Sequence, residues 1–383
     1  MPMTDDIRYV GVNDREVDLF EGLYVVPNGV AYNSYVIMDE KIAVMDAVDA
    51  RFGDAWVNNV REALSGRKPD YLVVHHMEPD HSAAIALFME AFPEAVIVSS
   101  AKAFPMMKAF FGTDFDGRRI IVKEGDKLEL GKHVLQFITA PMVHWPEVVM
   151  SYDACDKTLY SADGFGKFGA LDAEEDWACE ARRYYFGIVG KYGAQVQAVL
   201  KKASGLDIRT IRPLHGPVLE GEALTRALEL YDIWSSYRAE SEGVLIAYTS
   251  VYGHTRVAAE QLADQLRAKG VKVAMQDLAR CDIAEAVEDA FRYDRMVLAT
   301  TTYNADIFPP MRQFLTWLSE RGYRNRKVGL IENGSWAPMA AKVMRAMLGG
   351  CKDVTIVEPV VKIQSALNTE SAAQLDTLAE AMA

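Results

Sequence analysis

The chain has 383 residues, of which 50% are apolar and 25% charged, so it can form two globular domains with ordinary hydrophobic cores. Its formal net charge is -13 and it has no Lys/Arg-rich block, which argues against nucleic acid and anionic membranes as partners. No apolar run reaches the roughly 18 residues of a transmembrane helix, and residues 1–6 do not resemble a signal peptide, so a cytoplasmic protein is expected.

The first part of the chain is rich in predicted strands. Short apolar runs separated by turn-forming pairs predict strands at 23–27, 35–38, 42–45, 71–74, 95–98, 120–122, 134–138 and 148–152. Helical spacing of apolar residues predicts helices at 54–63, 83–91, 173–201 and 221–239. This mixture is typical of a layered α/β fold in which helices cover the sheets.

After the polar stretch 238–243 the pattern becomes a strict alternation of strand and helix. The strands are predicted at 244–249, 271–276, 295–300, 327–331 and 354–357, and the helices at 255–269, 284–291, 310–321, 338–348 and 370–382. Strands joined by crossover helices predict a doubly wound parallel sheet. We therefore expect one domain at 1–240 and a second at 241–383.

Four potential metal ligands fall within six residues, directly after the predicted strand 71–74. They are His76, Glu78, Asp80 and His81. Their spacing does not suit one face of a helix, so we expect them on an irregular loop at the end of a buried strand, where α/β proteins often form their sites.

Three further candidates each end a strand-like run: His144, Asp163 and His215. Together the seven residues offer four imidazoles and three carboxylates, which suits two metals that share one carboxylate. Nitrogen and oxygen ligands without a thiolate favour iron or manganese and are acceptable to zinc. The other histidines, His75, His133 and His254, are expected to be hydrogen-bonded structural residues.

The spacing H-x-[HE]-x-D-H, followed by distant His, Asp and His, resembles the metallo-β-lactamase superfamily. Glu78 and the segment His144-Trp145-Pro146 resemble its flavodiiron branch. The resemblance implies an N-terminal αββα sandwich that holds a di-iron centre. It further implies His76, Glu78 and His144 on one iron, Asp80, His81 and His215 on the other, and Asp163 as the bridge.

The loop 250–255, which joins the first strand of the second domain to a helix, offers hydroxyl and backbone N–H groups to a phosphate. It contains neither the P-loop motif of nucleotide triphosphate sites nor the G-x-G-x-x-G of dinucleotide sites. A Ser/Thr-rich turn that only caps the helix is the common alternative.

Two companion loops follow the third and fourth strands of this domain, and they are rich in Thr, Asn, Gly and aromatic residues. The three loops together resemble flavodoxin, although Tyr252 stands where a hydroxyl of Ser or Thr is usual. The resemblance implies FMN, bound by Ser250, Val251, Tyr252, Gly253, His254, Thr255, Thr301, Thr302, Tyr303, Asn304, Ala305, Asn333, Gly334, Ser335 and Trp336.

A flavin carrier beside a metal centre is useful when the metal changes its oxidation state, as iron does and zinc does not. The resemblance to flavodiiron proteins implies an oxidoreductase that reduces dioxygen to water, or nitric oxide to nitrous oxide, with FMN as the relay. It also implies a head-to-tail homodimer or a dimer of dimers. Because no further module follows the flavodoxin-like part, an external donor is expected, such as rubredoxin or a reduced deazaflavin.

Two other functions stay open at this point: a zinc hydrolase of the metallo-β-lactamase type, and an electron carrier whose metal domain is only a scaffold. Tyr184 and Tyr185 are candidate proton donors, but packing of their helix against the core is the favoured explanation for both residues. The four cysteines, Cys155, Cys179, Cys281 and Cys351, form no C-x-x-C pair, so we expect reduced structural thiols and neither a rubredoxin-like iron site nor a structural zinc site.

Overall fold

The structure, a computed structural model, describes residues 6–383. Residues 1–5 lie outside the described part. They make up most of the N-terminal segment 1–6, for which the sequence predicts no signal peptide. The chain forms two compact units, one of Met1–Tyr185 with Tyr192–Asp232 and one of Phe186–Lys191 with Ile233–Ala383. The boundary expected at residue 241 stays a prediction, since packing alone defines these units. Among the described helices, none combines the length and apolar character needed to cross a bilayer.

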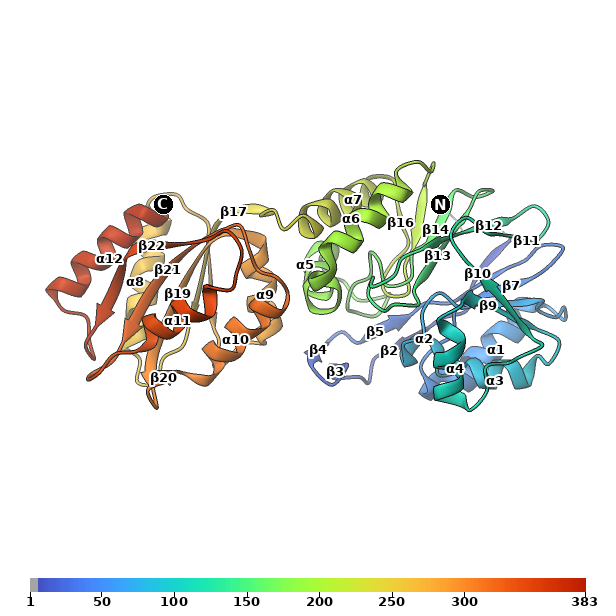
Figure 1. Cartoon of the computed structure of the whole chain (residues 1–383), viewed down its shortest axis with the longest axis horizontal. Helices are drawn as coiled ribbons and strands as arrows, with labels where there is room; N and C mark the ends of the chain where they lie inside the picture. The colour runs from blue at the N-terminus through green and yellow to red at the C-terminus, as the bar shows by residue number, and fades with distance from the viewer. Residues whose placement is uncertain (1–5) are drawn as a thin grey trace. The chain divides into compact units, whose positions relative to one another are not determined.

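The first unit is built on two mixed sheets (Figure 1), whose described strands follow here in spatial order. One sheet contains β1 (Ile7–Tyr9), β6 (Tyr35–Ile37), β7 (Ala43–Met45), β8 (Tyr71–Val73), β9 (Val96–Ser100) and β10 (Arg119–Val122). The other contains β11 (Lys127–Glu129), β12 (Val134–Thr139), β13 (Val149–Asp153), β14 (Thr158–Tyr160), β15 (Thr210–Arg212) and β16 (Leu219–Glu220). Two small ribbons pair β2 (Val12–Asp14) with β5 (Val30–Tyr32), and β3 (Leu19–Phe20) with β4 (Tyr24–Val25).

The inner faces of these two sheets form the core of the first unit. Ile37, Met45 and Val98 of one sheet belong to the same buried cluster as Phe137 and Val149 of the other. The outer layers are helical: α1 (Gly53–Leu64), α3 (Ile85–Ala91) and α4 (Ala103–Phe111) lie beside the first sheet, and α5 (Trp177–Tyr184), α6 (Gly193–Ala203) and α7 (Gly221–Ser235) beside the second (Figure 1). Sheets covered on both faces explain why whole strands such as β7 are buried. The expected αββα sandwich is confirmed.

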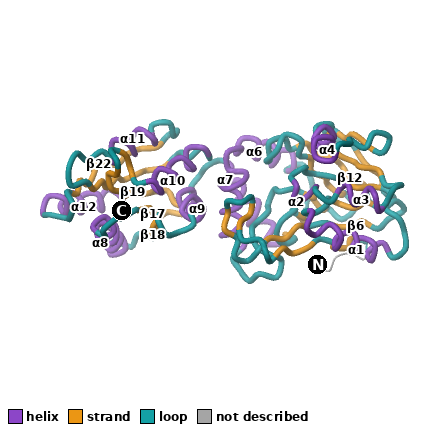
Figure 2. Tube along the Cα trace, turned by 90° about the horizontal axis from the view of Figure 1, so that it is seen from below, coloured by secondary structure: helices purple, strands orange, loops and turns teal. Residues whose placement is uncertain are grey.

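The second unit is a parallel sheet with helices on both faces (Figures 1 and 2). Its described strands have the order β18 (Val273–Asp277), β17 (Ser241–Tyr248), β19 (Tyr293–Tyr303), β21 (Arg326–Asn333) and β22 (Val354–Ile363), and all neighbours in this order pair in parallel. The crossover helices are α8 (His254–Ala268), α9 (Ile283–Arg292), α10 (Pro309–Glu320) and α11 (Ala340–Leu348), and α12 (Thr369–Met382) follows the last strand. A short strand, β20 (Asp306–Ile307), pairs with the end of β19. This strand order is that of the flavodoxin-like doubly wound fold, as expected.

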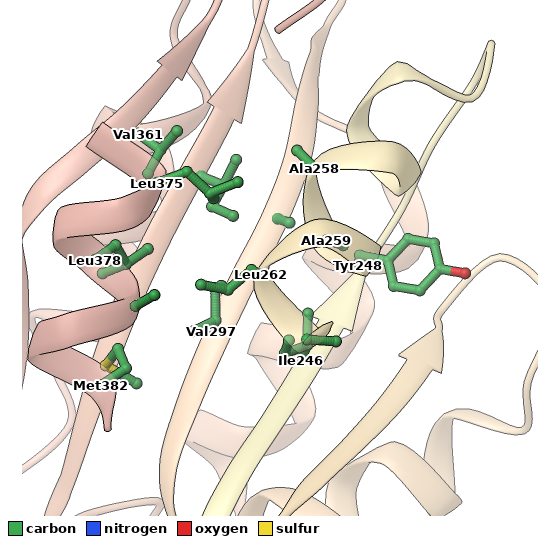
Figure 3. Packing of buried hydrophobic residues seen from close by; sticks show 14 of the residues in the cluster. Ile246, Tyr248, Ala258, Ala259, Leu262, Val297, Val361, Leu375, Leu378 and Met382 are labelled. Carbon is green, nitrogen blue, oxygen red and sulfur yellow. The ribbon is translucent and has the colours of Figure 1, made fainter. Parts of the chain in front are cut away.

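One face of this sheet is covered by α8 and α12 (Figure 3). Leu262 of α8 and Leu378 of α12 are fully buried in the same cluster as Ile246 and Val297 of the sheet. The three central strands β17, β19 and β21 are mostly buried, which accounts for the continuous apolar runs that predicted them.

The single helix expected at 173–201 is wrong. The chain forms α5, then a π-helical turn at Tyr185–Val189, a 3-10 turn at Gly190–Tyr192, and then α6. Tyr184, Tyr185 and Phe186 are consecutive and all fully buried, which one face of a regular α-helix cannot achieve. The wider π-helical turn distributes these rings over different directions, and the glycines that follow weaken helical continuation.

We expect Leu262→Ala to lower the free energy of unfolding by about 2–5 kcal/mol, because the substitution leaves a cavity between α8 and the sheet. Val257→Ala is the matched control on the same helix, because Val257 is half exposed, and it should change stability by no more than about 0.5 kcal/mol. Urea titration of the apoprotein, followed by tryptophan fluorescence, measures both values. Equal effects of the two substitutions would contradict this packing.

Candidate metal centre and cofactor pocket

The seven predicted ligands of the first unit converge and form two adjacent groups. In each group, one ligand atom from every residue lies within 4.8 Å of those of the others. One group consists of His76, Glu78, His144 and Asp163; the other consists of Asp80, His81 and His215. The structure thus brings together all of the residues that the spacing singled out. Their assignment as ligands stays a prediction.

The first four ligands follow β8, but they do not lie on a wholly irregular loop as expected. Glu78 is the N-cap of a one-turn helix, α2 (Pro79–Ser82), which carries Asp80 and His81. Pro79 occupies its first position, where the fixed φ of proline favours helix initiation. Because the chain turns into α2 at this point, residues that are close in the sequence belong to different groups. His76 and Glu78 belong to one group, and Asp80 and His81 belong to the other.

The other three ligands lie in loops at the end of the second sheet: His144 between β12 and β13, Asp163 after β14, and His215 after β15. Ala162, directly before Asp163, has a left-handed φ of 49°, which costs a residue other than glycine about 1–2 kcal/mol. Gly216, directly after His215, has a φ of 82°, and a Cβ atom there would lie 2.7 Å from Cγ of Lys167. Such backbone strain is typical of loops that position functional groups.

Asp163 connects the two groups. Its Oδ2 lies 3.3 Å from Nε2 of His76 and 3.1 Å from Nε2 of His144. Its Oδ1 lies 3.5 Å from Nε2 of His81 and 3.7 Å from Nε2 of His215. Each oxygen of this one carboxylate therefore faces a different pair of imidazoles, which is the arrangement that a bridging ligand requires.

The spacing of the ligand atoms fits two cations. Nitrogen and oxygen ligands bound at about 2.0–2.2 Å lie about 3.0–3.5 Å from one another in tetrahedral or octahedral geometry. The Nε2 atoms of His81 and His215 are 2.9 Å apart, and Nε2 of His144 is 3.0 Å from Oε2 of Glu78. The carboxylate oxygens of Asp80 and Asp163 are buried and accept no hydrogen bond from residues 6–383, a costly state that a bound cation relieves.

Neighbouring acceptors orient two of the imidazoles. Nδ1 of His76 donates to Oε1 of Glu147 at 2.8 Å, and the same oxygen accepts the backbone N–H of Met77 at 2.9 Å. Nδ1 of His215 donates to the carbonyl of Ala31 at 2.8 Å. Because Nδ1 carries the proton in both rings, the lone pair of Nε2 faces the centre. Glu147 was not predicted, and its position three residues after His144 is the only hint in the sequence.

A second buried network holds the chain just before His76. The backbone N–H of His75 donates to Oδ1 of Asp46 at 2.7 Å, its Nδ1 donates to Oδ2 of Asp46, and its Nε2 accepts from Ser151 at 2.8 Å. All three residues are buried. His75 is therefore hydrogen-bonded on both ring nitrogens, as expected for a structural histidine, and it ties β13 to the ligand loop.

The carboxylates and imidazoles of the centre shift each other's pKa values strongly. Burial lowers the pKa of His144, but the neighbouring carboxylates of Asp163 and Glu78 outweigh this effect and raise the pKa to about 9. Burial also lowers the pKa of His81, but the carboxylates of Asp80 and Asp163 outweigh this effect and raise it to about 10. Burial raises the pKa of Glu78, yet His144 and His76 lower it to about 2. Protons and metal ions therefore compete for the same ring nitrogens.

Two protonated groups lie close to these carboxylates. Burial of its carboxyl group and the charge on Glu78 raise the pKa of Glu21 to about 8, although the residue as a whole is exposed. Burial and the charges of Asp163 and Glu78 raise the pKa of Tyr184 well above its usual value. The ring of Tyr184 contacts His215, with 5.3 Å between ring centroids, and its buried hydroxyl has no hydrogen-bond partner among the described residues.

The second unit contains a cavity of about 760 Å³ at the carboxyl ends of its parallel strands. All of the residues predicted to bind FMN line it except Gly253, and Ala337, Met339 and Ser365 line it in addition. Tyr252 and Trp336 are 91% and 83% exposed, and large aromatic rings exposed at a pocket are suited to stacking on a flat ligand.

One end of this cavity suits a phosphate. Gly253 caps α8 with a left-handed φ of 96°, and the first turn of this 15-residue helix presents backbone N–H groups toward the loop. The Ser250 hydroxyl accepts from the N–H groups of Gly253 and Arg256 at 3.1 and 3.2 Å, which fixes the loop. The combination of a helix N-terminus, hydroxyl groups and aromatic rings fits a flavin mononucleotide.

Ser365 is a residue of this pocket that the sequence analysis missed. Its backbone N–H donates to Oδ1 of Asn333 at 3.1 Å, and its hydroxyl lies 2.6 Å from that of Ser335. Ser365 follows β22, the last parallel strand. All parallel strands of a sheet end at the same edge, so the loop after the fifth strand is expected to lie beside the loops after the first, third and fourth strands. This rule could have added Ser365 to the predicted FMN-binding residues.

Comparison with known proteins identifies related chains for both units. Residues 30–216 match the ODP family beta lactamase, and residues 246–373 match flavodoxin. The chain is 31% identical over 373 residues to a nitric oxide reductase of Moorella thermoacetica, which covers 94% of this chain and 92% of that protein.

Two solved structures are similar over the whole chain. The rubredoxin oxygen:oxidoreductase of Desulfovibrio gigas has 26% identity and a TM-score of 0.91, with 100% of this chain and 97% of that one covered. The flavodiiron protein of Giardia intestinalis also has 26% identity and a TM-score of 0.91, with coverage of 100% and 96%.

We expect Glu147→Ala to weaken metal binding by about 10–100-fold, because Nδ1 of His76 and the N–H of Met77 both lose their acceptor. Competition with a chelator for Fe²⁺, under anaerobic conditions, measures the change. Glu147→Gln keeps an oxygen acceptor in place and should lose less affinity than Glu147→Ala. Wild-type affinity in the alanine variant would show that Glu147 does not support the centre.

Proposed function

Because the chain belongs to the flavodiiron proteins, we propose that it reduces nitric oxide to nitrous oxide, dioxygen to water, or both, with FMN relaying electrons from an external donor. Family membership rests on the match to the nitric oxide reductase of Moorella thermoacetica, along almost the full length of both chains, and on the two matched domains. The observation that carries the proposal is the position of Asp163, whose two oxygens face two separate groups of ligands.

We assign the metal centre to a domain of residues 1–240 and the FMN site to a domain of residues 241–383. In this assignment His76, Glu78 and His144 hold one iron, Asp80, His81 and His215 hold the other, and Asp163 bridges them. The absence of cysteine from the seven supports iron rather than a thiolate-preferring metal. Three carboxylates also offset most of the charge of two divalent ions.

FMN is assigned to the cavity lined by the loops that follow β17, β19 and β21, together with Ser365. Bound there, FMN and the iron pair would supply the electron transfer that side chains cannot perform. The protein orients the cofactor through the Ser250–Thr255 loop at the start of α8 and through Asn333, whose side chain is held by Thr255 and Ser365.

Both proposed reactions consume protons. Two molecules of nitric oxide take up two electrons and two protons to give nitrous oxide and water; one dioxygen takes up four of each to give two waters. Tyr184 is suited to donate a hydrogen bond at the centre, because its raised pKa keeps the phenol protonated and its buried hydroxyl has no competing acceptor among the described residues. Two bound cations would lower this pKa and so favour the donation of a proton as well.

The partners are proposed from the relatives. The names of two of them, a nitric oxide reductase and a rubredoxin oxygen:oxidoreductase, support either gas as the substrate and a rubredoxin-type protein as the donor; a reduced deazaflavin is the alternative donor. We also propose a head-to-tail homodimer or a dimer of such dimers, because electron transfer needs each FMN close to an iron centre.

The test is to reduce the FMN- and iron-loaded protein anaerobically, expose it to each gas, and follow flavin reoxidation. We expect the wild type to reoxidise rapidly with at least one gas and to form nitrous oxide or water. Asp163→Asn should keep FMN but slow gas reduction by at least about tenfold, because a weakened bridge disturbs both metals. Rapid turnover in this variant, or zinc in place of iron in the native protein, would contradict the proposal.

Tyr184→Phe should lower the rate of gas reduction by about 10²-fold if its hydroxyl supplies a proton in the slow step. Iron and FMN contents should stay unchanged, and the solvent deuterium isotope effect on the rate should change. Tyr185→Phe is the control, because Tyr185 is equally buried and its ring packs on Tyr231. Equal rates in both variants would remove Tyr184 from the proton path.

A further inference from the structure

A second cluster of potential ligands lies where two hairpin turns of the second sheet meet. His133 lies in the turn between β11 and β12, and Cys155 and Asp156 lie in the turn between β13 and β14. A ring nitrogen of His133, the Cys155 sulfur and a carboxylate oxygen of Asp156 all lie within 4.8 Å of one another. We propose that these three residues bind one divalent transition-metal ion of the zinc type, separate from the centre described above.

One carboxylate fixes the geometry of this cluster. Oδ2 of Asp153 accepts from Nδ1 of His133 at 2.6 Å, and its Oδ1 accepts the backbone N–H of Cys155 at 3.0 Å. Asp153 is fully buried, as is His133. The imidazole and the turn that carries the thiol are therefore held by the same side chain, and the backbone of His133 is fixed further by Oδ2 of Asp39 at 2.7 Å.

The second ring nitrogen of His133, Nε2, is the atom of this cluster whose bonding the described part of the chain leaves unsatisfied. Nε2 is buried and has no hydrogen-bond partner among the described residues. The nearest carboxylate oxygen, Oδ2 of Asp6, lies 3.7 Å away and already accepts from Lys132 at 2.6 Å. Because Nδ1 donates to Asp153, the neutral ring presents the lone pair of Nε2. A carboxylate on one nitrogen and a free lone pair on the other is the arrangement of a metal-binding histidine.

The ligand types select the ion. An imidazole, a thiolate and a carboxylate match the ligands of zinc, whereas calcium and magnesium prefer oxygen alone. One thiolate and one carboxylate also balance the charge of a divalent ion. Water or Asp6 can complete four-coordination, since Oδ2 of Asp6 is near Nε2 of His133. The bound ion would add a link between two turns that are already joined by the contacts of Asp153 and by the strand pairing between β12 and β13.

The test uses the full chain loaded with iron and FMN. We expect equilibrium dialysis against micromolar Zn²⁺ to give one zinc per chain without loss of iron. Zinc should also slow alkylation of Cys155 by iodoacetamide by at least about tenfold, as mapped by peptide mass spectrometry, because a coordinated thiolate is protected. Cys281 provides the internal control, because it lies in the other unit, and its alkylation should be unaffected.

Two variants at half-buried turn positions avoid disturbing the core: Cys155→Ser and Asp156→Asn. Each should weaken zinc binding by at least about tenfold, while Cys281→Ser leaves it unchanged. Asp163→Asn should keep this zinc, which separates the two metal sites. The proposal is overturned if wild-type protein takes up zinc only in exchange for iron, if Cys155→Ser binds zinc as tightly as wild type, or if zinc fails to protect Cys155.

Discussion

The carboxylate of Asp163 is the constraint on which the first unit depends. It is buried, accepts no hydrogen bond from any residue that the structure describes, and faces two pairs of imidazoles with its two oxygens. An isolated buried carboxylate costs several kcal/mol, and an opposing positive charge must compensate it. The ligand loops, the strained backbone at Ala162 and the acceptors behind His76 and His215 all serve to surround this one group with nitrogen atoms.

Histidine appears in this unit in three environments that differ only in what each ring nitrogen contacts. In His75, Nδ1 donates to Asp46 and Nε2 accepts from Ser151, so the ring has a structural role. His76 has Glu147 on Nδ1 and the predicted ligands on Nε2. His133 has Asp153 on Nδ1 and no hydrogen-bond partner for Nε2 within the described chain. The resemblance of His133 to His76, rather than to His75, is the basis for a second metal site.

Much of the fold could be predicted because it depends on local patterns. The parallel strands of the second unit are continuous apolar runs, since helices cover both faces, and their predicted positions agree with the structure to within a few residues at most ends. Short edge elements such as β2, β3 and β16 carry too few residues for a periodic signal. The break between α5 and α6 was missed because its cause, the burial of three consecutive aromatic rings, is a matter of tertiary packing.

The sequence by itself determined which seven residues meet and which loops surround the cofactor cavity, because both follow from residue types placed at strand ends. It also identified the family through the spacing of those residues. The resemblance to the family also implied how the seven residues divide into two groups with Asp163 between them. Only the tertiary structure decided which way the side chains face, so that each oxygen of Asp163 lies near a different pair of imidazoles, and that Glu147, Asp46 and Ser365 support the sites. These features depend on side-chain directions and on partners distant in the chain, which spacing along a sequence does not encode.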